Sequence, residues 1–148
     1  MSLDEEEIYQ EHVLDHYEDP YHRGTCVAAT HADDGKNPLC GDIVRYELAI
    51  GDDGKIREIY FEGTGCCISQ ASASMLAEQM DGKTVDDISA FEASEMLEMF
   101  GARLTPNRQK CCLLPWRVLK SAVFSPLDGS DEDHVTERPA GPNLGEES

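Results

Sequence analysis

The chain has 148 residues, of which 40% are hydrophobic, and 30 acidic residues against 12 basic ones give it a formal net charge of −18. This size and hydrophobic content predict one domain with an ordinary core. So negative a chain repels phosphate backbones, which excludes nucleic acid as an expected partner; solvated acidic faces, a salt-adapted host or steering toward a basic partner would each explain the charge. No apolar run is long enough to span a membrane, and the acidic start MSLDEEEIYQ lacks the apolar segment of a signal peptide, so we expect a cytoplasmic protein without a membrane partner.

The first half of the chain predicts one helix followed by a hairpin. Apolar and aromatic residues at helical spacing predict a helix over 5–18, and residues 21–38 predict a short strand that runs into a loop. Strict alternation in DIVRYELAI, residues 42–50, predicts a half-buried strand. The turn sequence GDDG at 51–54 then leads into a returning strand over 55–63, so the two long strands are expected to form a hairpin.

The second half predicts helices. Residues 66–80 carry small and apolar side chains at helical spacing, and Gly82 is the expected C-cap of that helix. Residues 85–104 predict one or two further helices, and Thr84 with Asp87 three residues later predicts the N-cap of the first. TPNRQ, at 105–109, is expected to be a turn or a helix start. A last helix is expected over 110–124, and it must begin close before Pro115 or kink there, because proline removes a helical hydrogen bond.

The composition changes near the C-terminal end. Residues 127–148 contain few apolar side chains and many acidic ones, with proline and glycine between them, and predict a disordered acidic tail. The preceding residues, 1–126, are expected to form a single domain. Their order of one helix, then strands, then helices predicts an α+β fold with a small antiparallel sheet packed by helices.

The cysteines carry the chemical signal, and they occupy positions 26, 40, 66, 67, 111 and 112. A reducing compartment favours metal binding or thiol chemistry over disulfides. Cys40 leads into one strand of the predicted hairpin and the Cys66–Cys67 pair follows the other, so both ends meet at one edge of the sheet. The Cys111–Cys112 pair is expected to open the last helix, and Asp42 lies two residues after Cys40. Three sulfurs and one oxygen suit zinc or an iron–sulfur cluster, although the spacing alone also allows unrelated core cysteines.

Four segments resemble, in order, the signature segments of the IscU/SufU/NifU-N family of iron–sulfur cluster assembly scaffold proteins: DHYEDPYHRG, NPLCGD, GTGCCISQASASML and KCCLLPW. The resemblance covers roughly residues 8–124. It implies a shared site made of Cys40, Asp42, Cys66 and Cys111, the first cysteine of each vicinal pair being the ligand. In that family such a site holds iron or a nascent, transient [2Fe–2S] cluster in IscU-type scaffolds, and zinc (Zn²⁺) in SufU-type sulfur acceptors.

The resemblance also implies a function. We expect a scaffold that accepts sulfur from a cysteine desulfurase and supplies downstream iron–sulfur acceptor proteins, with Cys111 as the candidate persulfide acceptor. The alternative is a zinc-bound sulfur carrier, which is a sulfurtransferase and thus an enzyme. A purely structural zinc module is a third possibility, which Asp42 disfavours because structural zinc sites prefer cysteine and histidine ligands.

Two departures place the sequence between the subtypes. IscU types carry histidine directly before the last ligand cysteine, where this chain has Lys110, and a chaperone-recognition stretch, LPPVK, where this chain reads LTPNR at 104–108. Lys110 and the segment SQASASM resemble the corresponding positions of SufU types. The short spacing from Cys66 to Cys111 instead resembles IscU types, which lack the insertion found before the last cysteine of SufU types.

The remaining candidates have ordinary structural interpretations. Cys26 is expected to pack in the core, because free cysteine is often buried without a chemical role. Cys67 and Cys112 are also expected to pack, with a relay thiol as the alternative for either. His12 and His16 share a helix face with apolar residues, and we interpret them as interface histidines rather than ligands. Gly65 is expected to let the chain bend, so that the Cys66 side chain faces Cys40. Trp116 is consistent with either a core residue or an anchor for a partner.

Overall fold

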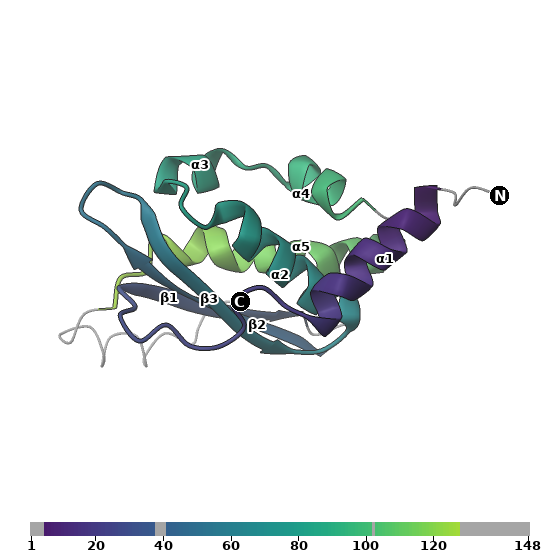
Figure 1. The fold of residues 1–148 in the computed structure, drawn as a ribbon, viewed down its shortest axis with the longest axis horizontal. Helices are drawn as coiled ribbons and strands as arrows, with labels where there is room; N and C mark the ends of the chain where they lie inside the picture. The colour runs from purple at the N-terminus through teal and green to yellow at the C-terminus, as the bar shows by residue number, and fades with distance from the viewer. Residues whose placement is uncertain (1–4, 38–40, 102, 128–148) are drawn as a thin grey trace.

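The structure is a computed structural model that describes residues 5–37, 41–101 and 103–127, with side chains described from Glu11 onward. These residues form five helices and three strands, in this order: α1 (Glu5–Glu18), β1 (His31–Asn37), β2 (Asp42–Ile50), β3 (Ile56–Thr64), α2 (Cys67–Met80), α3 (Val85–Ala90), α4 (Ala93–Phe100) and α5 (Pro106–Ala122). The predicted first helix and the predicted α+β architecture are confirmed (Figure 1). The predicted tail, 127–148, lies outside the described residues apart from Leu127, so the domain boundary stays a prediction.

The three strands form one antiparallel sheet in the order β1-β2-β3. The predicted hairpin of β2 and β3 is confirmed, and its turn is closed by a hydrogen bond from the Gly54 N–H to the Gly51 carbonyl oxygen, at 2.9 Å. At the other end of the hairpin, Ile43 pairs with Thr64. The residues just outside this pair, Asp42 and Gly65, are therefore brought to the same edge of the sheet.

Strand β1 lies where the sequence predicted a loop, and the strand predicted near residue 21 is absent from the described residues except for an isolated bridge between Arg23 and Phe61. The sequence of β1, HADDGKN, is mostly polar. Such a sequence suits a strand at the edge of the sheet, where few of its side chains are buried. Packing against α5 holds β1 in place: a Cβ added at Gly35 would lie 2.9 Å from a methyl carbon of Val118. Apolar and polar residues do not alternate along such a polar strand, so the sequence holds no pattern that predicts it.

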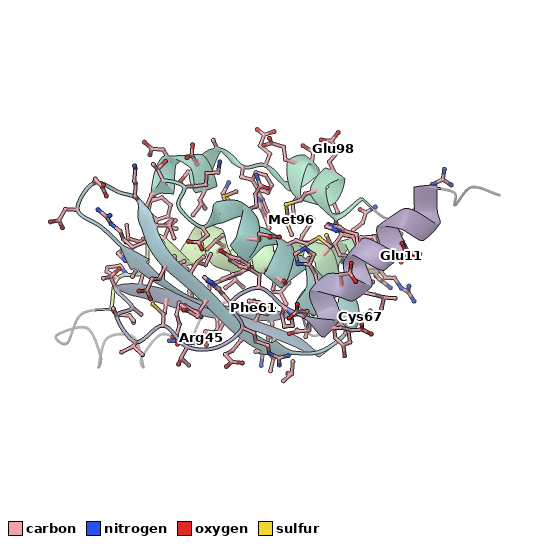
Figure 2. All side chains as sticks on the ribbon, in the orientation of Figure 1. Glu11, Arg45, Phe61, Cys67, Met96 and Glu98 are labelled. Atoms are coloured by element: carbon pink, nitrogen blue, oxygen red, sulfur yellow. The ribbon has the colours of Figure 1, made fainter. Side chains whose placement is uncertain are left out.

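The core lies between the sheet and two long helices. Figure 1 shows α2 and α5 lying across one face of the sheet, with α3 and α4 beyond them, and α1 packs against α2. Alternate strand residues face these helices and are at most 1% exposed: Val44, Tyr46, Leu48, Ile59 and Phe61. The half-buried strand predicted over 42–50 is therefore confirmed. In Figure 2, Arg45 projects instead from the open face of the sheet.

Helix α2 is covered by protein along most of its length. Residues 69–77 are all buried, and their small alanine and serine side chains let neighbouring elements approach closely. The Tyr46 hydroxyl, for example, donates a hydrogen bond to the Ala73 carbonyl oxygen at 2.7 Å. The C-cap of the helix is Asp81 rather than the predicted Gly82, which follows it with a φ of +85°. The start of α2 is thus fixed by the core rather than by local capping.

The two helices α3 and α4 account for the region predicted as one or two helices. Thr84 caps α3 through the predicted reciprocal hydrogen bonds with Asp87. In Figure 2, Met96 points from α4 into the fold, where it is fully buried, whereas Glu98 projects outward. This alternation shows that α4 buries one face against the rest of the domain.

Helix α5 begins within TPNRQ, the segment predicted as a turn or a helix start, and thus before the stretch expected over 110–124. Thr105 is its N-cap and Pro106 its first residue, so Pro115 lies inside the helix rather than near its beginning. Because proline has no amide hydrogen, the helical hydrogen bond to the Cys111 carbonyl oxygen is lost at this point. Packing of α5 against β1, β2 and α2 offsets that loss, and it brings residues from the middle of the helix to the edge of the sheet.

The described residues contain no helix that is both long enough and apolar enough to cross a lipid bilayer.

Candidate metal centre

Three of the four predicted ligands converge at one edge of the sheet. Asp42 begins β2, Cys66 directly precedes α2, and Cys111 lies within α5. Their potential ligand atoms, one carboxylate oxygen and two sulfurs, all lie within 4.8 Å of one another. Cys40 lies outside the described residues, so its role as the fourth ligand stays a prediction. The three ligands come from three elements that are distant in sequence.

Asp42 is fully buried, and its two oxygens have different surroundings. Oδ1 accepts a hydrogen bond from the Cys66 N–H at 2.8 Å, and Oδ2 lies 3.6 Å from the Cys66 sulfur. The backbone bond anchors the carboxylate to the start of α2. The second oxygen is thereby aimed toward the sulfur, in position to share a cation with it.

Gly65 makes this approach possible. Its φ is +132°, a conformation that side chains with a Cβ rarely adopt. A Cβ at this position would lie 2.2 Å from Asp42 Oδ1 and 2.8 Å from Asp42 Cα. The predicted bend at Gly65 is therefore confirmed, and it brings Cys66 close to Asp42. That the Cys66 side chain faces Cys40 stays a prediction, because Cys40 lies outside the described residues.

Cys111 lies in the second turn of α5, and its side chain is 1% exposed. The prediction that the cysteine pair opens the last helix is wrong, because α5 begins at Pro106. The amide of Asn37, at the end of β1, lies with Nδ2 3.6 Å from the Cys111 sulfur, and both residues are buried. Sequence reasoning missed Asn37. Its signal was its position directly before Pro38 in the NPLCGD segment.

The second member of each vicinal pair points away from the centre. Cys112 is fully buried in the core, and this burial raises the pKa of its thiol to about 12. Packing was thus predicted correctly for Cys112. The prediction of packing is wrong for Cys67, which is exposed at the first position of α2 (Figure 2). Adjacent helical residues point about 100° apart, so each pair divides between two environments.

Cys26 is a buried cysteine remote from the centre, as predicted. Its thiol lies 3.5 Å from a Glu58 carboxylate oxygen. Burial, and then this hydrogen bond, raise its pKa to about 11. A thiol held so firmly in its protonated form is a poor nucleophile or ligand.

A separate hollow of about 600 Å³ lies where α1 and the segment after it meet α2. Four of its eight lining residues are acidic, and none is a cysteine. The predicted interface histidine, His16, borders it: His16 Nδ1 lies 2.7 Å from Ser74 Oγ, and Nε2 lies 3.5 Å from a Glu78 oxygen. Burial, followed by the nearby charge of His12, lowers the pKa of His16. This hollow is distinct from the metal centre.

Trp116 and Lys110 flank the centre on α5 with different surroundings. The Trp116 indole N–H donates to the Phe91 carbonyl oxygen at 2.8 Å, and its ring packs on the core, which favours the core interpretation over a partner anchor. Lys110 is exposed beside Cys111. Its charge therefore faces solvent at the rim of the centre.

The donor set fits zinc or iron. Metal–thiolate distances of about 2.3 Å in a tetrahedral site separate two sulfurs by about 3.8 Å, so atoms already within 4.8 Å need shifts of only about 1 Å. Two thiolates and a carboxylate leave one tetrahedral position for a further ligand. Soft sulfur donors exclude magnesium or calcium as natural occupants.

Comparisons with known proteins agree with this geometry. Residues 8–127 match the family described as NifU-like N terminal domain. The iron-sulfur cluster assembly scaffold protein IscU of Thermotoga maritima is 35% identical over 132 residues, which cover 78% of this chain and 92% of that protein. The zinc-dependent sulfurtransferase SufU of Bacillus subtilis is 29% identical over 140 residues, covering 83% of this chain and 94% of that protein.

A solved structure shares the fold. It comes from Fervidobacterium islandicum AW-1, is described as a candidate iron-sulfur cluster assembly scaffold protein for the SUF system, and is 31% identical. It superimposes with a TM-score of 0.68 over 81% of this chain and 99% of that structure. The family match, the relatives and the shared fold lead to one conclusion: this chain belongs to the NifU-like N-terminal domain family, as the IscU/SufU/NifU-N resemblance predicted.

Proposed function

We propose that this protein is an iron–sulfur cluster assembly scaffold. It accepts sulfur from a cysteine desulfurase, holds iron and sulfide at Asp42, Cys66 and Cys111 with Cys40 as the fourth ligand, and passes the cluster to acceptor proteins. The observation that carries the proposal is the convergence of a carboxylate and two sulfurs from three elements within 4.8 Å. The scaffold relatives support it.

Sulfur acceptance is thiol chemistry of the chain itself. A cysteine thiolate attacks the outer sulfur of the donor persulfide, a new S–S bond forms, and the donor cysteine leaves as a thiolate. Cys111 is our candidate acceptor. Because Cys111 is 1% exposed whereas Cys66 is only partly buried, a partner reaches the Cys66 sulfur more readily. The acceptor assay must therefore compare both residues.

Asp42 suits a cargo that has to leave. A carboxylate oxygen is a harder ligand than a thiolate and holds soft metal ions less firmly. Oδ1 of Asp42 is already engaged by the Cys66 N–H, so Oδ2 is the oxygen available to a metal ion. We propose that this single carboxylate contact is the one released first during transfer.

The second candidate function is a zinc-bound sulfur carrier. It is favoured by Lys110, which stands directly before Cys111 in place of the histidine of IscU types, and by the similarity to the Bacillus sulfurtransferase. In this version zinc would be held by the same residues, and it would keep the cysteines as thiolates until the desulfurase reaches one of them. The two functions thus differ in what the centre holds at rest.

Metal analysis of protein purified without oxygen separates the two. A scaffold is expected to contain iron and acid-labile sulfide in equal amounts and to absorb visible light. A colourless protein with one zinc per chain supports the carrier. Protein that retains neither metal and takes up no cluster from ferrous iron and sulfide would contradict both.

Serine substitutions test the ligand set. Cys40→Ser, Cys66→Ser and Cys111→Ser are each expected to weaken metal binding strongly, because the serine hydroxyl is a poor replacement for a thiolate. Cys67→Ser is the matched control, since it changes the same group one residue along the chain and on the surface. Cys112→Ser is expected to lower stability without removing the metal. Loss of metal in Cys67→Ser with retention in Cys66→Ser would show that the wrong cysteine was assigned.

A further inference from the structure

The metal centre concentrates negative charge in a protein that is already strongly acidic. The sulfurs of Cys66 and Cys111 and the Asp42 carboxylate lie within 4.8 Å of one another, in a chain with a formal net charge of −18. Cysteine binds a metal ion as the thiolate, so both sulfurs add negative charge when a metal ion is bound. Among the ion pairs of the described residues, none joins Asp42 to a lysine or arginine. Bringing like charges together in a buried place is costly unless hydrogen-bond donors face them. Neutral donors around the centre are therefore the groups to examine.

We propose that Asn37 and Ser69 are positioning residues that donate hydrogen bonds to the two sulfurs, Asn37 to Cys111 and Ser69 to Cys66. Through these bonds they set how firmly the centre holds a metal ion. The inference rests on the proposed function, because it concerns the same ligands. It assigns the holding strength to two uncharged side chains that bind no metal themselves.

Asn37 is placed for this task by the register of the sheet. It ends β1 and pairs directly with Asp42 on β2, and directly opposed residues of neighbouring strands share a face. Its Nδ2 lies 3.6 Å from the Cys111 sulfur, and the two side chains are 4% and 1% exposed. An amide N–H in a dry environment is a strong partner for a sulfur that carries negative charge.

Ser69 lies one helical turn after Cys66 and is fully buried. Its Oγ lies 4.0 Å from the Cys66 sulfur, whose thiol is the donor in this structure, and donates to the Cys66 carbonyl oxygen at 3.1 Å. The amide of Gln70 donates to the same Oγ at 3.1 Å, so that side of the hydroxyl is occupied. The single proton of Ser69 is thereby left facing Cys66. A charged sulfur is a stronger acceptor than a neutral carbonyl, so the proton turns to the sulfur when Cys66 is ionised.

Gln70 supplies an independent sign that this arrangement has a role. The side chain is 5% exposed, and its Oε1 has no hydrogen-bond partner among the described residues. A buried unpaired carbonyl costs about 1–3 kcal/mol, so its retention calls for an explanation. The amide is wedged against Gly63, where an added Cβ would lie 3.2 Å from Oε1. The Gln70 amide is oriented so that its nitrogen holds Ser69 Oγ. This orientation accounts for the unpaired Oε1 at the other end of the amide.

Cobalt(II) is the probe for the test, because its sulfur-to-metal charge-transfer bands report on the thiolates and its affinity can be measured against a chelator. Ser69→Ala removes one hydroxyl, and Asn37→Ala removes the amide. Each is expected to weaken cobalt binding about tenfold, as removal of groups that orient metal ligands commonly does, and to move the charge-transfer bands to lower energy. Ser69→Thr keeps the hydroxyl and is expected to bind within about twofold of the original chain.

Ser72→Ala is the matched control. Ser72 is equally buried on the same helix, but its hydroxyl donates to the carbonyl oxygens of Ser69 and Cys112 rather than to a sulfur. Thermal unfolding without metal identifies any variant that fails to fold. If Asn37→Ala fails to fold, the comparison of Ser69→Ala with Ser69→Thr tests the proposal by itself.

The outcomes are distinguishable. Unchanged affinity and spectrum in Ser69→Ala would overturn the inference while the proposed function stands. Equal weakening in Ser72→Ala would also overturn it, because a general loosening of α2 would then explain the effect. If the original chain bound no cobalt at all, the proposed function would fail and the inference with it.

Discussion

Replacing Gly65 by alanine is expected to damage both the fold and the metal centre. The φ of +132° places Gly65 in a region that costs a residue with a Cβ about 1–3 kcal/mol. The new Cβ would also lie 2.8 Å from Asp42 Cα, a backbone atom that cannot rotate away. Overpacking of this kind costs about 1–3 kcal/mol more. The sum, about 2–6 kcal/mol, is a large share of the 5–15 kcal/mol typical of a whole domain.

The assay is chemical denaturation of metal-free protein, followed by cobalt affinity of whatever remains folded. Gly82→Ala is the matched control, because Gly82 has a φ of +85° but an added Cβ meets nothing within 4 Å. That variant is expected to lose only the strain energy of about 1–2 kcal/mol and to bind metal normally.

Gly65→Ala is expected to be less stable than Gly82→Ala by about 1–3 kcal/mol, the cost of the collision alone. It should also bind cobalt at least tenfold more weakly, because Asp42 must move to make room. Equal stability of the two variants, with normal cobalt affinity in Gly65→Ala, would refute the claim that close contact between Gly65 and Asp42 shapes the centre.

Three further predictions concern the carboxylate, α1 and the tail. Asp42→Ala is expected to slow cluster transfer to an acceptor protein and loss in air; faster loss than in the original chain would exclude the labile role. Burial, then the charge of His12, lowers the pKa of His16 below 6.5, so the unfolded chain binds this proton more readily and stability should fall as the pH drops below about 6.5. The His16→Gln variant should lose that part of the slope in denaturation curves. A chain ending at Leu127 is expected to fold and bind metal like the full chain, and a large drop in its melting temperature would contradict a disordered tail.

Much of the fold was readable from local pattern. The alternation of β2 and the capping residues of α3 depend on neighbours within a few positions, and both were predicted correctly. Strand β1 was missed because its place depends on a partner strand and on Gly35 lying beneath Val118, which no local pattern records. The cysteine pair was wrongly expected to open α5, because tertiary packing keeps Pro115 well inside a helix that its intrinsic preference would end.

The centre was predicted in part by geometry and in part by resemblance. Hairpin pairing placed Cys40, with Asp42 two residues later, and the Cys66–Cys67 pair at one edge, whereas the choice of the first cysteine of each pair came from the family motif. The structure supports that choice, since Cys112 faces the core. Asn37 and the exposure of Cys67 were missed, because contacts between side chains distant in sequence depend on how whole elements pack.

The way β2, β3 and α5 converge has an entropic consequence for the metal. Asp42 and Cys66 are 24 positions apart, and Asn37 and Cys111 are 74 apart, so an unfolded chain would have to close long loops to bring these groups together. In the folded domain, packing of the hydrophobic core already brings these groups together. Metal binding therefore does not have to close these loops. Asp42, Cys66 and Cys111 lie outside the main hydrophobic cluster, which is built from other side chains. We therefore expect the domain to stay folded when its metal ion leaves, whereas a small zinc module unfolds without its metal.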